Sequence, residues 1–274
     1  MAAPFVLREA FIDTQIHLKN NPELIRRTPV MQSASRLFLD DFSAVGPETK
    51  SKVPVIHVQE NTSFRCAQAL VSPGKRTAVL NFANAYVPGG GVKEGAPAQE
   101  ECLCRTSNLY EALTLPYFLR HYYKWNQKNT GDMGSDRIIF SPGVTVFKTD
   151  DDIPTMMPPE EWFQTDVSTC AAPYYNSEKK HPVNMEHLKS VFRNRIRNIL
   201  ETAMACGADR LVLGAFGCGA FNNPPDLVAG VFRELLLDSG YFRFFEKIVF
   251  AIKPSGADCP NLRAFRNAFP EENE

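Results

Sequence analysis

Short apolar runs alternate with amphipathic segments along most of this chain, and the alternation predicts strands that alternate with helices. The apolar runs are rich in β-branched residues and too short for helices, so each of them predicts a strand. They cover residues 53–58, 77–82, 166–173, 210–216 and 247–252, and residues 137–148 predict two further strands around a turn at Pro142 and Gly143.

Helices are predicted where apolar residues recur three and four positions apart. The clearest spans residues 188–203 and is expected to end near Gly207, which suits a left-handed C-cap. Its arginines, Arg193, Arg195 and Arg197, are assigned to the solvated side. Further helices are expected from Asn61 or Thr62 to Leu70, and over residues 99–113, 224–240 and 261–269.

The first fifty residues differ from the remainder and predict short helices that break at Pro22, Pro29 and Pro47. We therefore divide the chain into an N-terminal helical extension, residues 1–50, and one α/β domain, residues 51–274. Strands that alternate with helices imply a mostly parallel or mixed sheet between helical layers. Such sheets bind ligands at the carboxyl ends of their strands.

Composition narrows the possible functions. The chain has 274 residues, of which 44% are hydrophobic and 22% charged, as expected for one folded domain with an appendage. Its formal net charge of −1 provides no global positive field, so direct nucleic-acid binding is not expected. The N-terminus does not resemble a signal peptide, and the longest apolar run is too short to cross a bilayer, so we expect no membrane contact and a cytoplasmic or nuclear location. The seven cysteines lack metal-site spacing, so we expect free thiols and no bound metal.

Two glycine-rich loops follow predicted strands. The first, residues 88–98, carries a GGG triplet ahead of a predicted helix, and the second is GAFGCGAFNNPP, residues 214–225. If the two preceding strands are parallel neighbours, the loops face each other across one crevice. The second loop offers backbone N–H groups and a helix N-terminus, which suit a diphosphate, although a plain tight turn explains the same glycines.

Two adjacent acids, Glu100 and Glu101, follow Gln99 in the first turn of the helix after the triplet. Successive helical residues point about 100° apart, so one acid can face the crevice while the other reaches its flank. The helix dipole lowers a carboxyl pKa at this position, whereas desolvation and mutual repulsion raise it. Acid–base catalysis and simple decoration of a helix start are both compatible with these residues.

The glycine triplet, the next seven residues and Gln99-Glu100-Glu101 together resemble the signature of the poly(ADP-ribose) glycohydrolases. The surrounding LNFANAYVPGGG and AQEECLCRTSNLY, with GAFGCGAFNNP further on, resemble the compact microbial type of that family over residues 50–255. The resemblance implies a macrodomain-like α/β/α sandwich with a mixed central sheet. It also implies a glycoside hydrolase, without metal or cofactor, that cleaves ribose–ribose bonds of poly(ADP-ribose) and releases ADP-ribose. A module that binds ADP-ribose without hydrolysis and a hydrolase of mono-ADP-ribosylated targets are the alternatives.

The resemblance also implies roles for single residues. Glu101 matches the catalytic glutamate, a general acid and then base, and Glu100 matches the glutamate that holds the ribose beside the scissile bond. Asn84 matches an asparagine that contacts a ribose hydroxyl, and Asn61 stands where many macrodomains place an adenine-binding Asp. ADP-ribosylated proteins are implied as partners, and we expect a monomer. The implied substrate-binding residues in and after the two loops are Gly89, Gly90, Gly91, Gln99, Phe216, Gly217, Cys218, Gly219, Ala220 and Phe221.

Overall fold

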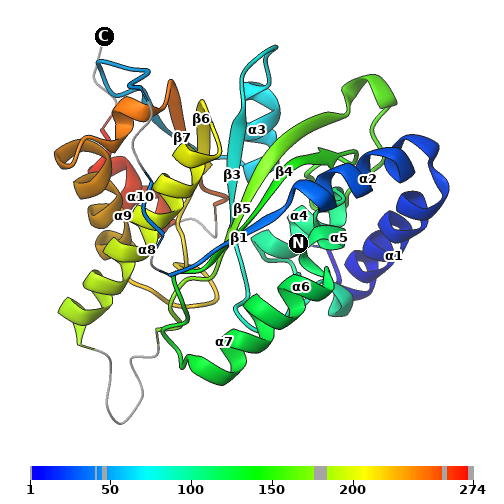
Figure 1. Ribbon diagram of the computed structural model, residues 1–274, viewed down its shortest axis with the longest axis horizontal. Helices are drawn as coiled ribbons and strands as arrows, with labels where there is room; N and C mark the ends of the chain where they lie inside the picture. Colours follow the sequence, from blue (N-terminus) through cyan, green and yellow to red (C-terminus); the bar gives the residue numbers. More distant parts are fainter. Residues whose placement is uncertain (1, 41, 45–47, 176–183, 255–257, 271–274) are drawn as a thin grey trace.

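A mixed β-sheet forms the centre of the molecule. The structure, a computed structural model, describes residues 2–40, 42–44, 48–175, 184–254 and 258–270. Within these residues the sheet has seven strands in the order β1-β4-β5-β3-β6-β7-β2 (Figure 1). Strand β4 runs antiparallel to β1 and β5, and the other neighbours are parallel. The strands are β1 (Arg36–Phe38), β2 (Ile56–Gln59), β3 (Thr77–Phe82), β4 (Ile138–Val146), β5 (Phe163–Cys170), β6 (Arg210–Leu213) and β7 (Lys247–Ala251).

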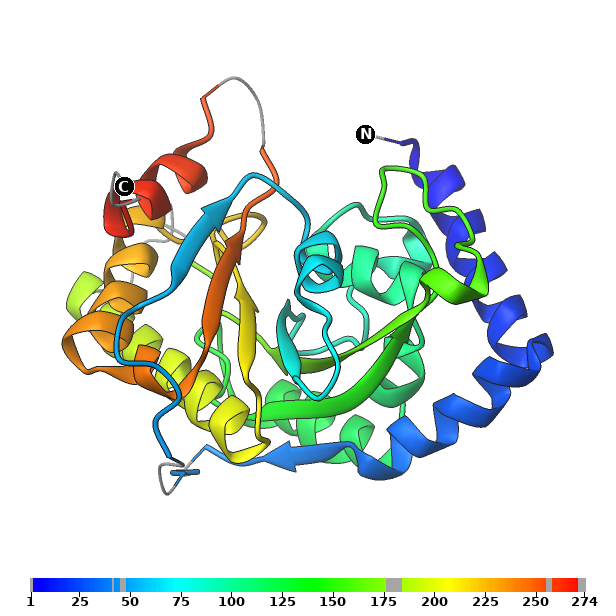
Figure 2. The ribbon, with the colours of Figure 1, turned by 90° about the horizontal axis from the view of Figure 1, so that it is seen from above.

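Helices cover both faces of the sheet (Figure 2). Helices α8 (Met185–Ala205), α9 (Pro225–Arg233) and α10 (Pro260–Ala268) lie on one face. On the other face lie α3 (Ser63–Leu70), α4 (Gln99–Thr106) and α5 (Leu109–Leu113), with α1 (Pro4–Asn20) and α2 (Pro22–Ala34) packed beside them.

Successive residues of the central strands alternate between two hydrophobic cores, as the twofold repeat of a strand requires. In β3, Ala78 and Leu80 face the core under α8, whereas Val79 faces the core under α3 and α4. A sheet buried on both faces explains why these strands are continuous apolar runs in the sequence. The predicted fold class, an α/β/α sandwich with a mixed sheet, is confirmed.

A helical segment between residues 116 and 129 has no counterpart among the predicted elements. It consists of α6 (Pro116–Phe118), the π-helical turn η2 (Leu119–Tyr123) and α7 (Lys124–Asn129). The π-turn departs from 3.6 residues per turn, so the apolar residues of this segment do not recur at the spacing by which a helix is predicted. A second π-helical turn, η4 (Glu234–Asp238), continues α9, and 3₁₀ turns form η1 (Val92–Glu94), η3 (Pro159–Glu161) and η5 (Tyr241–Phe244).

Two predicted elements were wrong in detail. Residues 137–148 contain the single strand β4, in which Pro142 and Gly143 form a bulge instead of a hairpin turn. The helix predicted after the glycine triplet is two helices, α4 and α5. The chain leaves the helical path because the side-chain oxygen of Asn108 accepts a hydrogen bond from the Thr145 N–H at 2.8 Å.

The N-terminal segment also differs from its prediction. Pro22 begins α2 at the predicted break, but Pro29 lies inside α2. Burial of Leu24 and Met31 on one face holds the helix together despite the hydrogen bond that this proline removes. The segment also supplies β1, an edge strand of the sheet. Pro47 lies outside the described residues, and the predicted domain boundary stays a prediction.

Arg195 of α8 is buried, so its predicted place on the solvated side was wrong. Only 1% of it is exposed, whereas the other two predicted arginines of this helix are exposed. Its Nε donates to Asp136 Oδ1 at 2.9 Å, and its Nη1 donates to the carbonyl oxygens of Met133 at 2.8 Å and Ala171 at 2.9 Å. Arg195 therefore joins the loop before β4 to the segment after β5.

No helix in the described part of the chain is long and apolar enough to cross a membrane.

Candidate active site

A cavity opens where β3 and β6 separate. These strands are paired in parallel only as far as Val79 and Val212, whereas β3 and β5 stay paired to Phe82 and Cys170. Both glycine-rich loops leave the carboxyl ends of β3 and β6, so the predicted crevice between them is confirmed. Its volume is about 640 Å³, and its lining includes Asn84, Gln99, Glu100, Glu101, Gly217, Gly219, Ala220 and Phe221.

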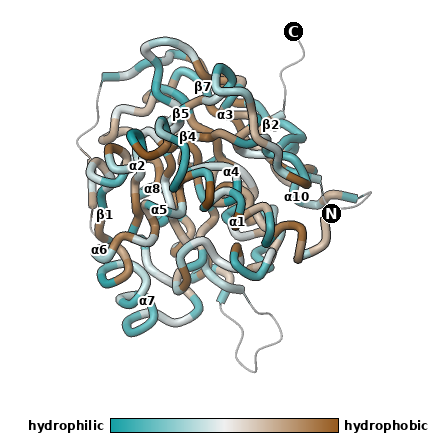
Figure 3. The backbone as a smooth tube through the Cα atoms, turned by 90° about the vertical axis from the view of Figure 1, so that its right-hand side faces the viewer, coloured by the Kyte–Doolittle hydropathy of each residue, from teal (hydrophilic) through white to brown (hydrophobic). Residues whose placement is uncertain are grey.

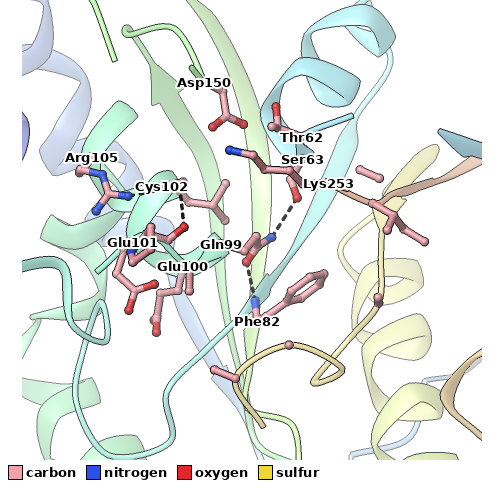
Figure 4. A pocket seen from close by; sticks show the side chains of 18 of the residues that line it. Thr62, Ser63, Phe82, Gln99, Glu100, Glu101, Cys102, Arg105, Asp150 and Lys253 are labelled. Atoms are coloured by element: carbon pink, nitrogen blue, oxygen red, sulfur yellow. Dashed lines mark hydrogen bonds between the residues drawn. The ribbon is translucent and has the colours of Figure 1, made fainter. Parts of the chain in front are cut away.

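The side chain of Gln99 fills the gap that β6 leaves beside β3. Its Oε1 accepts a hydrogen bond from the Phe82 N–H at 2.8 Å (Figure 4). Its Nε2 donates to the Leu80 carbonyl oxygen, also at 2.8 Å. The same Nε2 lies 3.0 Å from Ser63 Oγ at the start of α3. Gln99 thus satisfies two strand groups that would otherwise lack partners, and it fixes the first turn of α4 against the sheet.

Glu100 is held by hydrogen bonds on both carboxylate oxygens. Only 3% of the residue is exposed. Its Oε2 accepts from the Asn84 N–H at 2.7 Å, and its Oε1 lies 3.4 Å from Asn81 Nδ2. Burial, together with the nearby Glu101 carboxylate, raises the pKa of Glu100 to about 8, although the two N–H donors act in the opposite direction.

Glu101 has one engaged and one free oxygen. Its Oε1 accepts from the Gly91 N–H at 2.8 Å, while Oε2 is buried and has no hydrogen-bond partner in the described part of the molecule. Gly90 lies against both carboxylates with φ +55°, and a Cβ there would collide with Glu101 Oε1 and lie 3.1 Å from Glu100 Oε2. The two acids therefore converge on one glycine, which has no room for a side chain.

The second loop is tied to the segment that follows β5. Asn223 is 1% exposed, and its Nδ2 donates to the carbonyl oxygens of Pro173 at 2.7 Å and Gly217 at 2.9 Å. Gly217 has φ +76°, and a Cβ there would lie 2.5 Å from Ala172 Cβ. In contrast, nothing lies within 4 Å of the Cβ position of Gly219. The loop is thus anchored at one side and open toward the cavity at the other, ahead of the N-terminus of α9.

The side chains of two predicted loop residues pack against the core and do not line the cavity. The Phe216 side chain is fully buried in the core, where it packs against Phe82 and Phe192 with ring centroids 5.9 and 6.1 Å apart. The thiol of Cys218 lies 3.7 Å from the Phe216 carbonyl oxygen, and burial raises its pKa to about 12. Such a thiol is not a nucleophile near neutral pH. These two residues can contribute their backbone groups to the cavity wall.

Several residues that line the cavity were not predicted to do so. Asp150 accepts a hydrogen bond from the Phe64 N–H at 3.1 Å at the N-terminus of α3, and burial raises its pKa. Lys253 reaches the same side of the cavity and pairs with Asp152 at 2.6 Å. Asn61, which the resemblance places at the adenine-binding position, also lines the cavity, and its Oδ1 accepts a hydrogen bond from the Thr62 N–H at 2.9 Å. The acidic run was predicted only as a loop, because no local pattern shows that it meets α3.

Arg105 ties α4 to the loop that precedes it. It is 1% exposed, donates to the Ala96 carbonyl oxygen at 2.7 Å, and lies 3.2 Å from Cys102 Sγ. The start of α1 adds to the rim of the cavity through Ala2 and Leu7. In the described residues no group of three or more His, Cys, Asp or Glu side chains could hold a metal ion.

Comparisons with known proteins agree on one family. The family model described as microbial-type PARG, catalytic domain, matches residues 13–149. The crystal structure of poly(ADP-ribose) glycohydrolase from Thermomonospora curvata is 32% identical with a TM-score of 0.84, and the match covers 96% of this chain and 99% of that one. Its complex with the inhibitor ADP-HPD is 31% identical, with a TM-score of 0.81 and the same coverage. The enzyme from Deinococcus radiodurans in complex with ADP-ribose is 32% identical with a TM-score of 0.76, and the match covers 88% of this chain and 96% of that one. No curated protein matches the sequence.

Proposed function

This chain belongs to the microbial-type poly(ADP-ribose) glycohydrolase family, and we propose that Glu101 is the general acid and base of its reaction. The enzyme is a glycoside hydrolase that cleaves ribose–ribose O-glycosidic bonds of poly(ADP-ribose) and releases ADP-ribose. The observation that carries the assignment is that Glu101 lines the cavity with a buried Oε2 that has no hydrogen-bond partner among the described residues.

The chemistry follows from the two glutamates and their different partners. Protonated Glu101 donates its proton to the departing ribose oxygen while positive charge develops at the anomeric carbon. The same carboxylate, now ionised, takes a proton from the attacking water. One residue acts twice, since both carboxylates converge on Gly90 and do not flank a sugar from opposite faces. The Gly91 N–H holds the other oxygen of Glu101 in place throughout.

Glu100 is the positioning partner in this proposal. Two carboxyl groups this close share protons, and their titrations belong to the pair. The raised pKa of about 8 keeps one proton on the pair near neutral pH. In the substrate complex we place that proton on Glu101, because Glu100 then accepts from a ribose hydroxyl in addition to the Asn84 N–H and Asn81, and donors to a carboxylate favour its ionised form. Glu100 then orients a ribose hydroxyl with its remaining acceptor capacity, and Asn84 contributes to the same ribose site.

The second loop is proposed to hold the diphosphate. Its backbone N–H groups and the N-terminus of α9 provide positive partial charge without a lysine or a metal ion. Gly219 leaves the backbone open to the ligand, whereas Asn223 fixes the loop from behind. Phe221 lines the cavity and can pack against the distal ribose. We expect activity without metal or other cofactor, as a monomer, on ADP-ribosylated proteins that carry the polymer, and without direct nucleic-acid binding.

One experiment separates this function from its alternatives. Purified protein is incubated with poly(ADP-ribose) and, in parallel, with a mono-ADP-ribosylated protein, and free ADP-ribose is quantified over time. Release from the polymer is expected, since the chain belongs to a family of polymer hydrolases. Release only from the mono-modified protein would assign the chain to the second alternative. Binding of ADP-ribose without any release would make it a binding module.

A further inference from the structure

A basic segment without acids borders the loop that carries the glycine triplet. From residue 112 to residue 131 the sequence has no Asp or Glu, but it contains Arg120, His121, Lys124 and Lys128, in a chain whose formal net charge is −1. The segment forms η2 and α7. Figure 1 shows α7 beside the lower end of the loop that leaves β3, and Figure 3 shows α7 as a hydrophilic segment at the edge of the molecule.

The cations of this segment are not neutralised by neighbouring carboxylates. Most other arginines and lysines of the described residues form ion pairs. Arg120, Lys124 and Lys128 are exposed, and none of them has a carboxylate partner within the described part of the chain. Their positive charge is therefore available to a polyanion in solution.

An aromatic pair continues the same face. Tyr117 is 57% exposed, and its ring lies 4.5 Å from the His121 ring, centroid to centroid, with an angle of 35° between the planes. Lys124 and Lys128 lie four residues apart on one side of α7, and the π-helical turn η2, which contains His121, joins this helix to Tyr117. Exposed rings that alternate with cations are the combination that binds the bases and phosphates of flexible single strands.

Hydrogen bonds connect this face to the catalytic carboxylates. Gln127 of α7 donates to the Tyr86 carbonyl oxygen at 2.8 Å, and the Tyr86 hydroxyl donates to the Gly131 carbonyl oxygen at 2.9 Å. The Tyr86 N–H donates to Asn84 Oδ1 at 2.8 Å, and the Asn84 N–H donates to Glu100 at 2.7 Å. The basic face therefore lies next to the loop that leads from β3 to the glycine triplet, on the side of the two glutamates.

We propose that Tyr117, His121, Lys124 and Lys128 bind the part of poly(ADP-ribose) that lies beyond the scissile bond. This inference rests on the proposed function. In this proposal the ADP-ribose unit that is released occupies the cavity, and the rest of the polymer extends past the glycine triplet toward α7. The next unit carries two phosphates and an adenine: the two lysines attract the phosphates, and the aromatic pair stacks on the adenine. The face thus favours polymer over released ADP-ribose.

The test reverses the charge of the two lysines. Lys124→Glu/Lys128→Glu is compared with the matched control Lys19→Glu/Lys52→Glu, which changes the net charge equally at two other exposed positions. The measurements are kcat and KM for poly(ADP-ribose) between about 50 and 200 mM salt and the Kd of free ADP-ribose. We expect KM to rise on the order of tenfold at low salt, and the slope of log KM against log salt to fall by about 1.4 for two lost phosphate contacts. The kcat and the Kd of ADP-ribose should stay at native values.

A second variant tests the aromatic half of the face. Tyr117→Ala should raise KM for the polymer on the order of tenfold with an unchanged salt slope, because stacking does not release counterions. A Tyr117→Phe variant keeps the ring and should behave as native. Equal KM values for Tyr117→Ala and Tyr117→Phe would show that the ring of Tyr117 does not stack on the adenine of the polymer.

Specific outcomes overturn the proposal. Unchanged polymer KM in the α7 lysine variant, or an equal rise in the control variant, would show that this face has no local role. If single-stranded RNA inhibited the native protein but not the lysine variant, while polymer KM stayed native, the face would belong to nucleic acid. Absence of ADP-ribose release by the native protein would refute the proposed function itself, and the native arm of the same assay reports that separately.

Discussion

Replacement of Glu100 by Gln should make the protein more stable above pH 8 relative to the native chain. The folded-state pKa of Glu100 is raised from 4.5 to about 8. A carboxyl with a raised folded pKa binds its proton more tightly in the folded state. Its stabilising contribution is therefore complete below pH 4.5, and it is lost as pH rises to about 8. The difference of about 3.5 pKa units corresponds to about 5 kcal/mol of unfolding free energy, a large part of a typical total.

The amide that replaces the carboxyl group should fit the site with little other change. Its oxygen would keep the hydrogen bond from the Asn84 N–H, and its NH₂ group would face Asn81. The Oδ1 of Asn81 has no partner in the described residues, so a flip of that amide gives the new donor an acceptor. The assay is denaturant unfolding of Glu100→Gln, the native chain and the exposed control Glu160→Gln across about pH 4.5 to 9. The difference in unfolding free energy between Glu100→Gln and the native chain should increase by about 5 kcal/mol from the lowest to the highest pH. Parallel curves for those two proteins would refute the reasoning about burial.

Three further substitutions test the architecture of the site. Gly90→Ala should lower kcat at least about 100-fold, because its Cβ would collide with the carboxylate of Glu101, whereas Gly230→Ala, with nothing within 4 Å, should keep native turnover. Asn223→Ala should lower the unfolding free energy by about 2–4 kcal/mol and weaken ADP-ribose binding measured by calorimetry, since two buried carbonyl groups lose a donor; native binding would contradict its anchoring role. Gln99→Ala should lower the unfolding free energy by about 2–4 kcal/mol and reduce kcat more than it changes KM, because the first turn of α4 loses its attachment to β3. An unchanged kcat would contradict this role of Gln99.

The parts of the fold that depend on short-range patterns could be predicted from the sequence. Strand β3 was predicted with its observed bounds, because a strand buried on both faces is a continuous apolar run. The parallel pairing of β3 with β6 was a condition of the predicted crevice, and the structure meets that condition and places both loops at one crevice. Glu100, Glu101 and Gly90 all belong to the motif found in the sequence, and the structure brings both carboxylates against Gly90.

Features that depend on distant contacts could not be predicted. Arg195 follows the charged pattern of a solvated helix side, yet it is buried because loops before β4 and after β5 supply its acceptors. Asn223 has the local signature of a turn residue, and its role comes from the carbonyl of Pro173, fifty residues away in sequence. The helix at residues 116–129 was missed because its π-turn breaks the usual periodicity.

The most direct test of the account is turnover of Glu101→Gln on poly(ADP-ribose), beside the native chain, with free ADP-ribose quantified and ADP-ribose affinity measured in parallel. Glutamine keeps an acceptor for the Gly91 N–H but cannot donate and recover a proton as a carboxyl group does. We predict a loss of at least about 100-fold in kcat with ADP-ribose affinity within about twofold of native. Full turnover by Glu101→Gln would show that another group is the acid and base of this enzyme.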